Sequence, residues 1–241
     1  MREAGKVLAE IMGKLKEKVK EGITTKELER AAQVLIFNYK AEPAFKGYKG
    51  FPNALCASVN SQVVHAAPSN YVLKKGDVLS LDLGIKLNGY FSDMAFTMAI
   101  GEVNPETARF IRITRKSLKM AINKAKPGNT FGDIGNTIQR YVEGQGFAVI
   151  RDLCGHGIGR NLHEEPQIAN YGSRHKGEEI KEGMVFCIEP MTSMGDYRLK
   201  KSDDGFGYES KDGSLTCHFE HTLAILNGKA SVLTTHICRF N

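Results

Sequence analysis

The sequence lacks any run of apolar residues approaching the roughly 20 that cross a bilayer, which argues against a membrane-spanning helix. We also expect no signal peptide, because the N-terminal stretch is charged and has helical spacing rather than an apolar core. These features predict a cytoplasmic protein without a membrane partner. The net charge is +6, yet the lysines and arginines are scattered, with no dense arginine run and no interleaved aromatic residues. This pattern predicts no specific nucleic-acid binding.

The sequence also has no CxxC pair among its cysteines, and their number is odd. An odd count with irregular spacing is typical of reduced thiols in a reducing compartment. We therefore expect free thiols at all of them: Cys56, Cys154, Cys187, Cys217 and Cys238. The missing CxxC partner also argues against a zinc site on Cys154 and His156.

A chain of 241 residues, 41% of them hydrophobic, is long enough for one large domain or two small ones with a proper core. One pattern occurs twice, as KVKEGITTKEL at 18–28 and as KAKPGNTFGDI at 124–134. Each copy lies between two stretches whose apolar spacing predicts amphipathic helices, at 1–20 and 25–39 and at about 106–125 and 131–144.

This repeat indicates a single domain, 1–241, built from two related halves at about 1–105 and 106–241. Chance similarity is the alternative. If the halves are real, a site at their junction would draw ligands from both. In the first copy, Thr24 and Glu27 form a capping-box pattern that predicts the start of a helix.

The clearest signal for a strand pair lies at 78–98, where apolar and polar residues alternate on both sides of an Asn-Gly pair at 88–89. This pattern predicts a β-hairpin with a two-residue turn. In the resulting register, Asp82 and Asp93 are diagonal neighbours on one face, roughly 7–8 Å apart. Gly84, opposite Asp93, would leave room between the two carboxylates.

Two carboxylates on one face of apparently buried strands need partners, because an unpaired buried charge costs several kcal/mol or more. The hairpin alone leaves two interpretations open. Each aspartate could be hydrogen-bonded to backbone or paired with a lysine at a strand end, or the two could share a divalent cation. The rest of the chain has to decide.

Further titratable side chains lie in otherwise apolar strands, next to glycines, or where a strand gives way to a loop: His65, His156, His163, Glu189 and Glu220. Taken singly, a histidine is more often structural and a strand glutamate more often exposed. Glu189 lies near the end of an expected strand at 184–191, and Glu220 lies inside another at 218–226. Three aromatic residues in a glycine-rich loop either fill a local core or line an apolar pocket: Phe45, Tyr48 and Phe51.

Taken together, four carboxylates and one imidazole form a candidate metal site: Asp82, Asp93, His156, Glu189 and Glu220. Without cations, converging carboxylates would repel each other and some would take up protons. Two divalent ions would balance the four negative charges. Oxygen-rich ligation with one histidine suits Mn, Fe(II), Co or Zn. Two such ions roughly 3.5–4 Å apart can share a water and stabilise a tetrahedral intermediate.

The order and local context of these residues resemble the methionine aminopeptidases, most closely the bacterial type I form. The matching motifs cover nearly the whole chain: VNSQVVHAAP, LDLGIKLNGYFSDMA, CGHGIGRNLHEEP, MVFCIEPM and HFEHT. The resemblance implies the pita-bread fold, an α/β domain with pseudo-twofold halves, a curved antiparallel sheet and helices on its outer face. It also implies a cytoplasmic metallo-aminopeptidase that removes the initiator methionine from nascent proteins with two divalent metal ions (Co, Mn, Fe(II) or Zn).

The resemblance also implies a role for each residue of the site. Asp82 would chelate one ion, Asp93 and Glu220 would bridge both, and His156 and Glu189 would complete the second. Glu189 would also accept the proton of the bridging water. The two histidines that match the family's non-ligand histidines, His65 and His163, would contact the substrate and stabilise the transition state.

A pocket for the methionine side chain maps, by the same resemblance, to Phe45, Tyr48, Phe51, Cys56, Leu162 and Phe206. The sequence has no tryptophan, so Phe206 stands where many type I enzymes carry one. Leu162 replaces a commoner phenylalanine and Phe45 a commoner cysteine. The pocket remains apolar, and we expect it to accept an unbranched thioether.

Two alternatives belong to the same fold. A proline-specific dipeptidase or aminopeptidase would characteristically carry a large extra N-terminal domain, whereas this chain begins at the first catalytic-domain helix. A non-catalytic binding member would have lost metal ligands, and all five are present. The expected partner is thus a peptide or nascent chain beginning with methionine. We expect a monomer, and contact with the ribosome stays open.

Overall fold

The four helices of the computed structural model, which describes residues 1–235, lie where the apolar spacing predicts them. They form two consecutive pairs: α1 (Arg2–Lys18) with α2 (Thr25–Asn38), and α3 (Pro105–Lys124) with α4 (Phe131–Glu143). Cys238 lies outside the described residues, and the other four cysteines are free. No helix within residues 1–235 is both long and apolar enough to cross a membrane.

The second helix of each pair begins with the same capping box. At the start of α2, the Thr24 hydroxyl accepts the Glu27 backbone N–H and the Glu27 carboxylate accepts the Thr24 backbone N–H. Thr130 and Asp133 repeat both bonds at the start of α4. These reciprocal bonds satisfy backbone donors that would otherwise lack partners in the first helical turn. The capping box predicted at Thr24 is confirmed.

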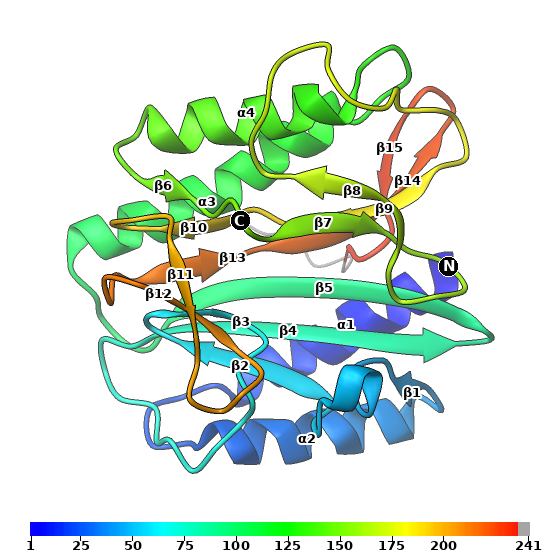
Figure 1. The fold of residues 1–241 in the computed structure, drawn as a ribbon. Coiled ribbons are helices and arrows are strands. Elements are labelled where there is room, and N and C mark those ends of the chain that lie inside the picture. Colours follow the sequence, from blue (N-terminus) through cyan, green and yellow to red (C-terminus); the bar gives the residue numbers. More distant parts are fainter. Residues whose placement is uncertain (236–241) are drawn as a thin grey trace.

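Nine strands form one antiparallel sheet that curves between the helix pairs (Figure 1). Its path runs through β1 (Glu42–Pro43), β4 (Val78–Leu87), β5 (Tyr90–Ala99), β14 (Glu220–Leu226), β9 (Val185–Ile188), β7 (Cys154–Gly157) and β8 (Glu164–Ala169). Two further strands pair off this path, β2 (Leu55–Val59) with β4 and β15 (Lys229–Val232) with β14.

Two small sheets complete the strand pairing of the described residues. One contains β13 (Thr216–His218), β10 (Met191–Ser193) and β6 (Ala148–Val149). The other contains β11 (Leu199–Lys201), β12 (Tyr208–Ser210) and β3 (Gln62–Val64). A short 3-10 helix, η1 (Tyr48–Gly50), lies in the aromatic loop before β2.

The hairpin of β4 and β5 has the predicted register throughout. Leu87 pairs with Tyr90 across the turn, and Gly84 pairs with Asp93. Asn88 and Gly89 both have positive φ, 51° and 81°, as a two-residue primed turn requires. The alternation therefore fixed which side chains of both strands face the helices and which face the opposite side.

The apolar face of the hairpin packs on the first helix pair, and the second pair covers a separate core. Leu79, Leu81 and Leu83 are fully buried in one cluster with side chains of α1 and α2. A second cluster joins Phe110 of α3 and Ile138 of α4 to Phe186 of β9 and other strand residues. Each helix pair thus covers one part of the curved sheet.

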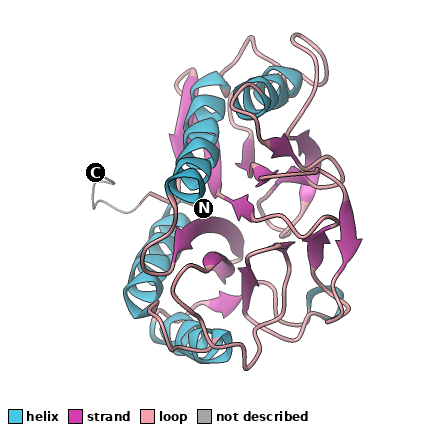
Figure 2. Cartoon of the chain, turned by 90° about the vertical axis from the view of Figure 1, so that its left-hand side faces the viewer, coloured by secondary structure: helices cyan, strands magenta, loops and turns pink. Residues whose placement is uncertain are grey.

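The helices line the outer side of the curved sheet, whose opposite side faces the small sheets (Figure 2). This is the mixed α/β arrangement with a curved antiparallel sheet that we expected. The polar face of the β4–β5 hairpin, with its two aspartates, points away from the helices and into the concavity. The fold therefore places the acidic side chains where a substrate can reach them.

Two predicted strands are in fact broken, and both breaks lie at a candidate ligand. The expected strand at 184–191 is β9 followed by β10, with Glu189 and Pro190 between them. The expected strand at 218–226 is β13 followed by β14, which begins at Glu220. In both places the chain passes from the small sheet to the large one or back. Proline at 190 lacks the N–H that a continuous ladder would need.

Candidate metal centre and substrate pocket

The site is built on a row of residues that crosses four neighbouring strands. Cys56 of β2 pairs with Asp82 of β4, Asp82 pairs with Ala95 of β5, and Ala95 pairs with Glu220 of β14. Residues paired in this way point to the same face of a sheet. The small side chain of Ala95 leaves the two carboxylates on either side of it facing a common space. Asp93, two residues before Ala95 on β5, points to that same face.

Side-chain hydrogen bonds hold the backbone of Asp93 and of Glu189 in place. The hydroxyl of Thr222 accepts the Asp93 backbone N–H at 2.9 Å and donates to the Asp93 carbonyl at 2.7 Å. The side-chain amide of Asn170 donates to the Glu189 carbonyl at 2.9 Å. The backbone of Asp93 is therefore held by β14, and that of Glu189 by a side chain just after β8.

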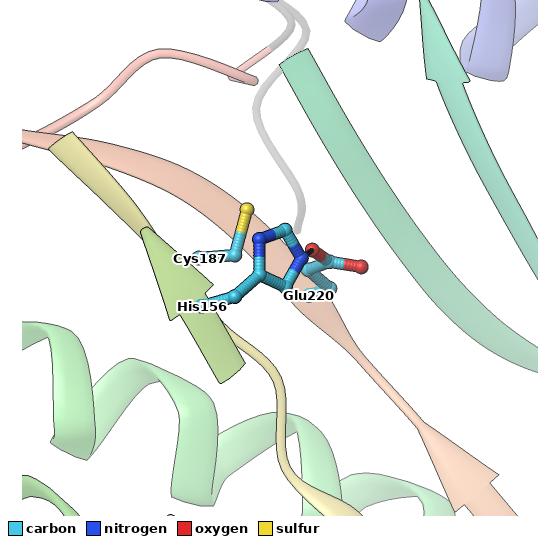
Figure 3. Close-up of side chains that lie close together, drawn as sticks. All are labelled: His156, Cys187 and Glu220. Atoms are coloured by element: carbon cyan, nitrogen blue, oxygen red, sulfur yellow. Dashed lines mark ion pairs between the residues drawn. The ribbon is translucent and has the colours of Figure 1, made fainter. Parts of the chain in front are cut away.

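His156 reaches the carboxylates from β7. Its Nε2 lies 3.6 Å from Glu189 Oε1 and 3.9 Å from Glu220 Oε1. Figure 3 shows the ring aimed at the Glu220 carboxylate, with the Cys187 thiol beside it. The His156 Nδ1 lies 2.9 Å from the carbonyl oxygen of Gly157, which can only accept, so Nδ1 carries the proton. Nε2 therefore presents a free lone pair to the carboxylates, as a metal-ligating histidine does.

Glycines beside His156 let the neighbouring strands approach the backbone of β7. A Cβ at Gly155 would lie 2.4 Å from the Cys187 carbonyl oxygen, and one at Gly157 would lie 2.1 Å from the Glu165 carbonyl oxygen. Both distances are far below van der Waals contact, so only glycine fits at these positions. The glycines thus serve the packing that sets the position of His156.

Burial makes the four carboxylates prefer protons. It raises the pKa of Asp93 to about 7, and it raises those of Asp82, Glu189 and Glu220 well above their usual range, with repulsion between the carboxylates adding to the effect. Among the described residues, Asp82 Oδ1 and Glu220 Oε1 are buried atoms without a hydrogen-bond partner. Such orphaned oxygens are costly unless a cation lies against them.

The donor atoms fit divalent cations. Three sets of side chains each bring three donor atoms within 4.8 Å of one another: Asp82 with Asp93 and Glu220, His156 with Cys187 and Glu220, and Glu189 with His218 and Glu220. Glu220 belongs to all three sets, so the sets form one continuous cluster. A cluster rich in carboxylate oxygens with imidazole at one end suits Mn, Fe(II), Co or Zn.

Two further histidines face the cluster from the loops. His163 Nδ1 lies 2.8 Å from the Tyr48 hydroxyl, and its ring centroid lies 4.2 Å from that of His156. His65 follows β3 with a φ of 59°, a left-handed conformation that is uncommon for a non-glycine residue and is often found at functional sites. Desolvation in the cavity, together with nearby Lys201 and Lys49, lowers the pKa of His65 to about 4. Desolvation, His156 and Lys49 lower the pKa of His163 to about 3. Both rings are therefore neutral at pH 7.

A cavity of about 440 Å³ lies over the cluster, and every candidate site residue of the sequence lines it. Its acidic floor is continuous with an apolar wall whose members are Phe45, Tyr48, Phe51, Cys56, Leu162 and Phe206. The rings of Phe51 and Phe206 pack edge to face with centroids 5.5 Å apart. Burial raises the pKa of the Cys56 thiol, so Cys56 is an uncharged member of this wall. The roles of these residues in catalysis stay predictions.

Gly84 makes room for a different neighbour from the one expected. The sequence suggested that it leaves room between Asp82 and Asp93. A Cβ at Gly84 would instead lie 2.7 Å from the ring of Phe45 and 2.9 Å from the Cβ of Ala44. The missing side chain therefore makes room for the loop that carries the wall of the cavity.

Sequence reasoning missed several residues of the site. His218 and Cys187 each lie two positions before a candidate ligand, Glu220 and Glu189, and the period-2 alternation of a strand would have placed them on the same face. Lys49 and Lys201 also line the cavity. No local pattern pointed to the two lysines, because only the tertiary fold brings η1 and β11 to the mouth of the cavity.

The chain is similar to known proteins over nearly its whole length. A sequence model described as metallopeptidase family M24 matches residues 1–227. A methionine aminopeptidase of Clostridium perfringens is 49% identical over 97% of this chain and 94% of its own length. Methionine aminopeptidase 1 of Bacillus subtilis is 43% identical with the same coverage.

Solved structures agree with the sequence relatives. A methionine aminopeptidase of Thermotoga maritima matches with a TM-score of 0.96 at 41% identity, over 98% of this chain and 95% of that one. A prolidase of Pyrococcus horikoshii has a TM-score of 0.77 at 22% identity and is covered only to 60% of its length. The second likeness concerns the fold alone.

Proposed function

The chain belongs to metallopeptidase family M24, and from that membership we propose that it is a methionine aminopeptidase, which releases the N-terminal methionine of peptides and nascent proteins. One observation supports this most strongly. Three buried carboxylates, the partly buried carboxylate of Glu189 and the lone pair of His156 meet at the floor of a cavity whose wall is apolar. Relatives with the same activity in their names match almost end to end.

We propose that two divalent ions bind at the floor, held by Asp82, Asp93, His156, Glu189 and Glu220. When bound, such ions polarise the scissile carbonyl and lower the pKa of the attacking water. Their combined charge matches that of the four carboxylates, which removes the cost of burying those groups ionised. The choice among Mn, Fe(II), Co and Zn belongs to this proposal.

The protein's own groups carry the protons. Glu189 accepts the proton of the attacking water and returns it to the leaving amine. His163, held by the Tyr48 hydroxyl, and His65 face the cavity as neutral rings, and each can donate an N–H to the oxyanion that develops on the substrate carbonyl. The apolar wall holds the methionine side chain, and Phe206 and Leu162 give it a wall without tryptophan.

A proline-specific peptidase of the same fold is the second candidate, and likeness to two prolidases and an X-Pro aminopeptidase at 21–24% identity supports the shared fold only. Type II enzymes of the family resembled carry a helical insertion between the two glutamates that correspond to Glu189 and Glu220. In the described chain this segment contains strands and loops but no helix, which favours the bacterial type I form. We further propose that the enzyme acts in the cytoplasm, since its four described cysteines are free thiols. That it acts as a monomer is also part of this proposal.

The test is a peptide panel assayed with and without a chelator. We expect release of methionine from Met-Ala-Ser, at least about 100-fold faster than leucine from Leu-Ala-Ser or proline from Pro-Ala-Ser, and complete loss of activity after metal removal. Release of X-Pro dipeptides in place of methionine would reject the proposed substrate class.

A further inference from the structure

A buried histidine outside the proposed ligand set faces the other side of the Glu189 carboxylate. His218 ends β13 and is 2% exposed. Its Nε2 lies 3.5 Å from Glu189 Oε2 and 3.9 Å from Glu220 Oε2. Within the described residues this Nε2 has no hydrogen-bond partner. A buried ring nitrogen without a partner is costly, so a use for this nitrogen is expected.

The carboxylates of Glu189 and Glu220 lie between two imidazoles, and each imidazole faces one oxygen of both carboxylates. The Oε1 atoms of Glu189 and Glu220 face His156, and their Oε2 atoms face His218. His156 has its proton held on Nδ1 by the Gly157 carbonyl, which leaves Nε2 as a lone-pair donor to a metal. No such carbonyl is bonded to the His218 ring among the described contacts. The Nε2 of His218 is therefore free to carry a proton and donate it in a hydrogen bond.

The backbone of His218 is fixed independently of its ring. Its N–H donates to the Thr97 hydroxyl at 2.9 Å, and its carbonyl accepts from that hydroxyl at 2.8 Å. Thr97 lies on β5 and is also 2.8 Å from the Ser80 hydroxyl of β4. The imidazole is thus presented to Glu189 from a rigid part of the sheet, which a positioning role requires.

We propose that His218 is a positioning residue that donates its Nε2–H to Glu189 Oε2 and holds this carboxylate with Oε1 toward His156. The inference rests on the proposed function, in which Glu189 moves the proton. Without this bond, the Glu189 carboxylate could change its rotation while the other four proposed cation ligands remained in place. The separation of 3.5 Å is long for a hydrogen bond, and catalytic bonds commonly tighten when substrate is bound.

The test compares three variants of the full chain, loaded with saturating Mn²⁺, in kcat and KM for Met-Ala-Ser. His218→Leu removes the donor, His218→Asn keeps an amide that is too short, and His218→Gln keeps an amide that can reach. We expect kcat to fall about 10- to 100-fold in H218L and H218N, with KM within about 3-fold, and to stay within about 5-fold in H218Q. If H218L fails to fold, the pair H218N and H218Q carries the comparison.

Three further measurements separate positioning from other roles. Calorimetric titration with Mn²⁺ should give the same number of bound ions in all three variants as in the parent. Adding H218L to Glu189→Gln should cause little further loss of kcat, because the two residues act through one group. His221→Gln, which removes a partly buried imidazole that contacts Thr234 instead, should keep the parental kcat.

Parental kcat in H218L and H218N, or loss of one bound Mn²⁺ in H218L, would overturn the inference, the latter by making His218 a metal ligand. A parent enzyme that releases no methionine would reject the proposed function before any variant is compared. The two failures are thereby distinguishable.

Discussion

At the scale of single residues, the site brings together groups that each fit poorly in a protein interior. Glu220 is 2% exposed and Asp93 is 3% exposed, and neither has a lysine or arginine partner in the described chain. Burial of an ionised carboxylate costs several kcal/mol unless charge of the opposite sign is close by. The tautomer of His156, set by the Gly157 carbonyl, points a lone pair into the same space. Cations bound at the cluster explain both the buried carboxylates without cationic partners and the lone pair that His156 directs at them.

The apolar wall gives the first prediction. Phe51→Ala removes a ring that is 8% exposed and packs against Phe206. Burying an apolar side chain such as that of the substrate's methionine contributes about 1.5–3 kcal/mol, and Phe51 forms part of the wall that buries it. We therefore expect kcat/KM for Met-Ala-Ser to fall roughly 10- to 100-fold, mostly through KM. Phe37→Ala is the matched control, since Phe37 is 79% exposed on α2. Equal kinetic effects of the two substitutions would contradict the pocket assignment.

The sequence predicted those site residues that sit in a strong local pattern. Asp82 and Asp93 followed from two alternations that meet at one turn, and a slip of one residue would have broken both. His218 was missed although the same alternation places it on the face of Glu220, because a single histidine in a strand is more often structural. Lys49 and Lys201 come from distant segments, so their placement depends on the tertiary fold.

At the scale of elements, the β4–β5 hairpin is the support for both parts of the site. Its polar face presents two aspartates to the cluster, and the missing side chain at Gly84 leaves room for the loop that carries Phe45. The backbone N–H of Ala44 also donates to the Gly84 carbonyl at 3.0 Å. One hairpin therefore sets the position of the two aspartates and of the pocket wall relative to each other.

This arrangement predicts that Gly84→Ala changes substrate binding and leaves metal binding intact. The new Cβ would push against Phe45 and Ala44, so we expect KM for Met-Ala-Ser to rise about 10-fold. Mn²⁺ affinity, measured by calorimetry, should stay within about 3-fold, since the three atoms nearest to the new methyl group belong to Phe45 and Ala44. Loss of Mn²⁺ affinity with an unchanged KM would instead support the earlier interpretation that Gly84 spaces the two carboxylates.

Helices and long strands were predictable because their periodicity extends over many residues. The breaks at Glu189 and Glu220, where the chain passes from one sheet to another, were not predictable, since each break involves only one or two residues. Pro190 is the only local sign of the first break, and it was compatible with the end of a single strand. The pairing of β10 with β13 connects segments that are far apart in the sequence.

At the scale of the whole molecule, two helix pairs with matching capping boxes each cover one part of the curved sheet. The cluster draws Asp82 and Asp93 from the first half of the chain and His156, Glu189 and Glu220 from the second. The division into related halves at about residue 105 stays a prediction. Two related halves, each with its own packed core, would place the site at their junction.

The shared acidic floor predicts how stability depends on pH. In the metal-free protein, carboxyls with a raised folded-state pKa stabilise the fold while protonated, and this stability is lost as the pH rises toward that pKa. The histidines whose folded-state pKa is lowered, His65, His163 and His218, act in the opposite direction between about pH 4 and pH 6.5, so the loss is clearest above pH 6.5.

We therefore expect the chelated protein to melt at a lower temperature at pH 8 than at pH 6.5. The slope is up to about 1.4 kcal/mol of unfolding free energy per pH unit for each proton involved. Saturating Mn²⁺ should raise the melting temperature more at pH 8, where protons no longer compete for the carboxylates. Asp93→Asn, which cannot ionise, should reduce the slope. An equal Mn²⁺ effect at both values would contradict this account.

The most direct test of the central claim is an anaerobic titration of the metal-stripped protein with Mn²⁺ that follows bound metal and methionine release in the same samples. The account predicts no release without metal, activity that rises with occupancy of the carboxylate cluster, and neither binding nor release in Asp93→Asn and Glu220→Gln. Methionine release at an undiminished rate by the fully stripped protein would contradict it.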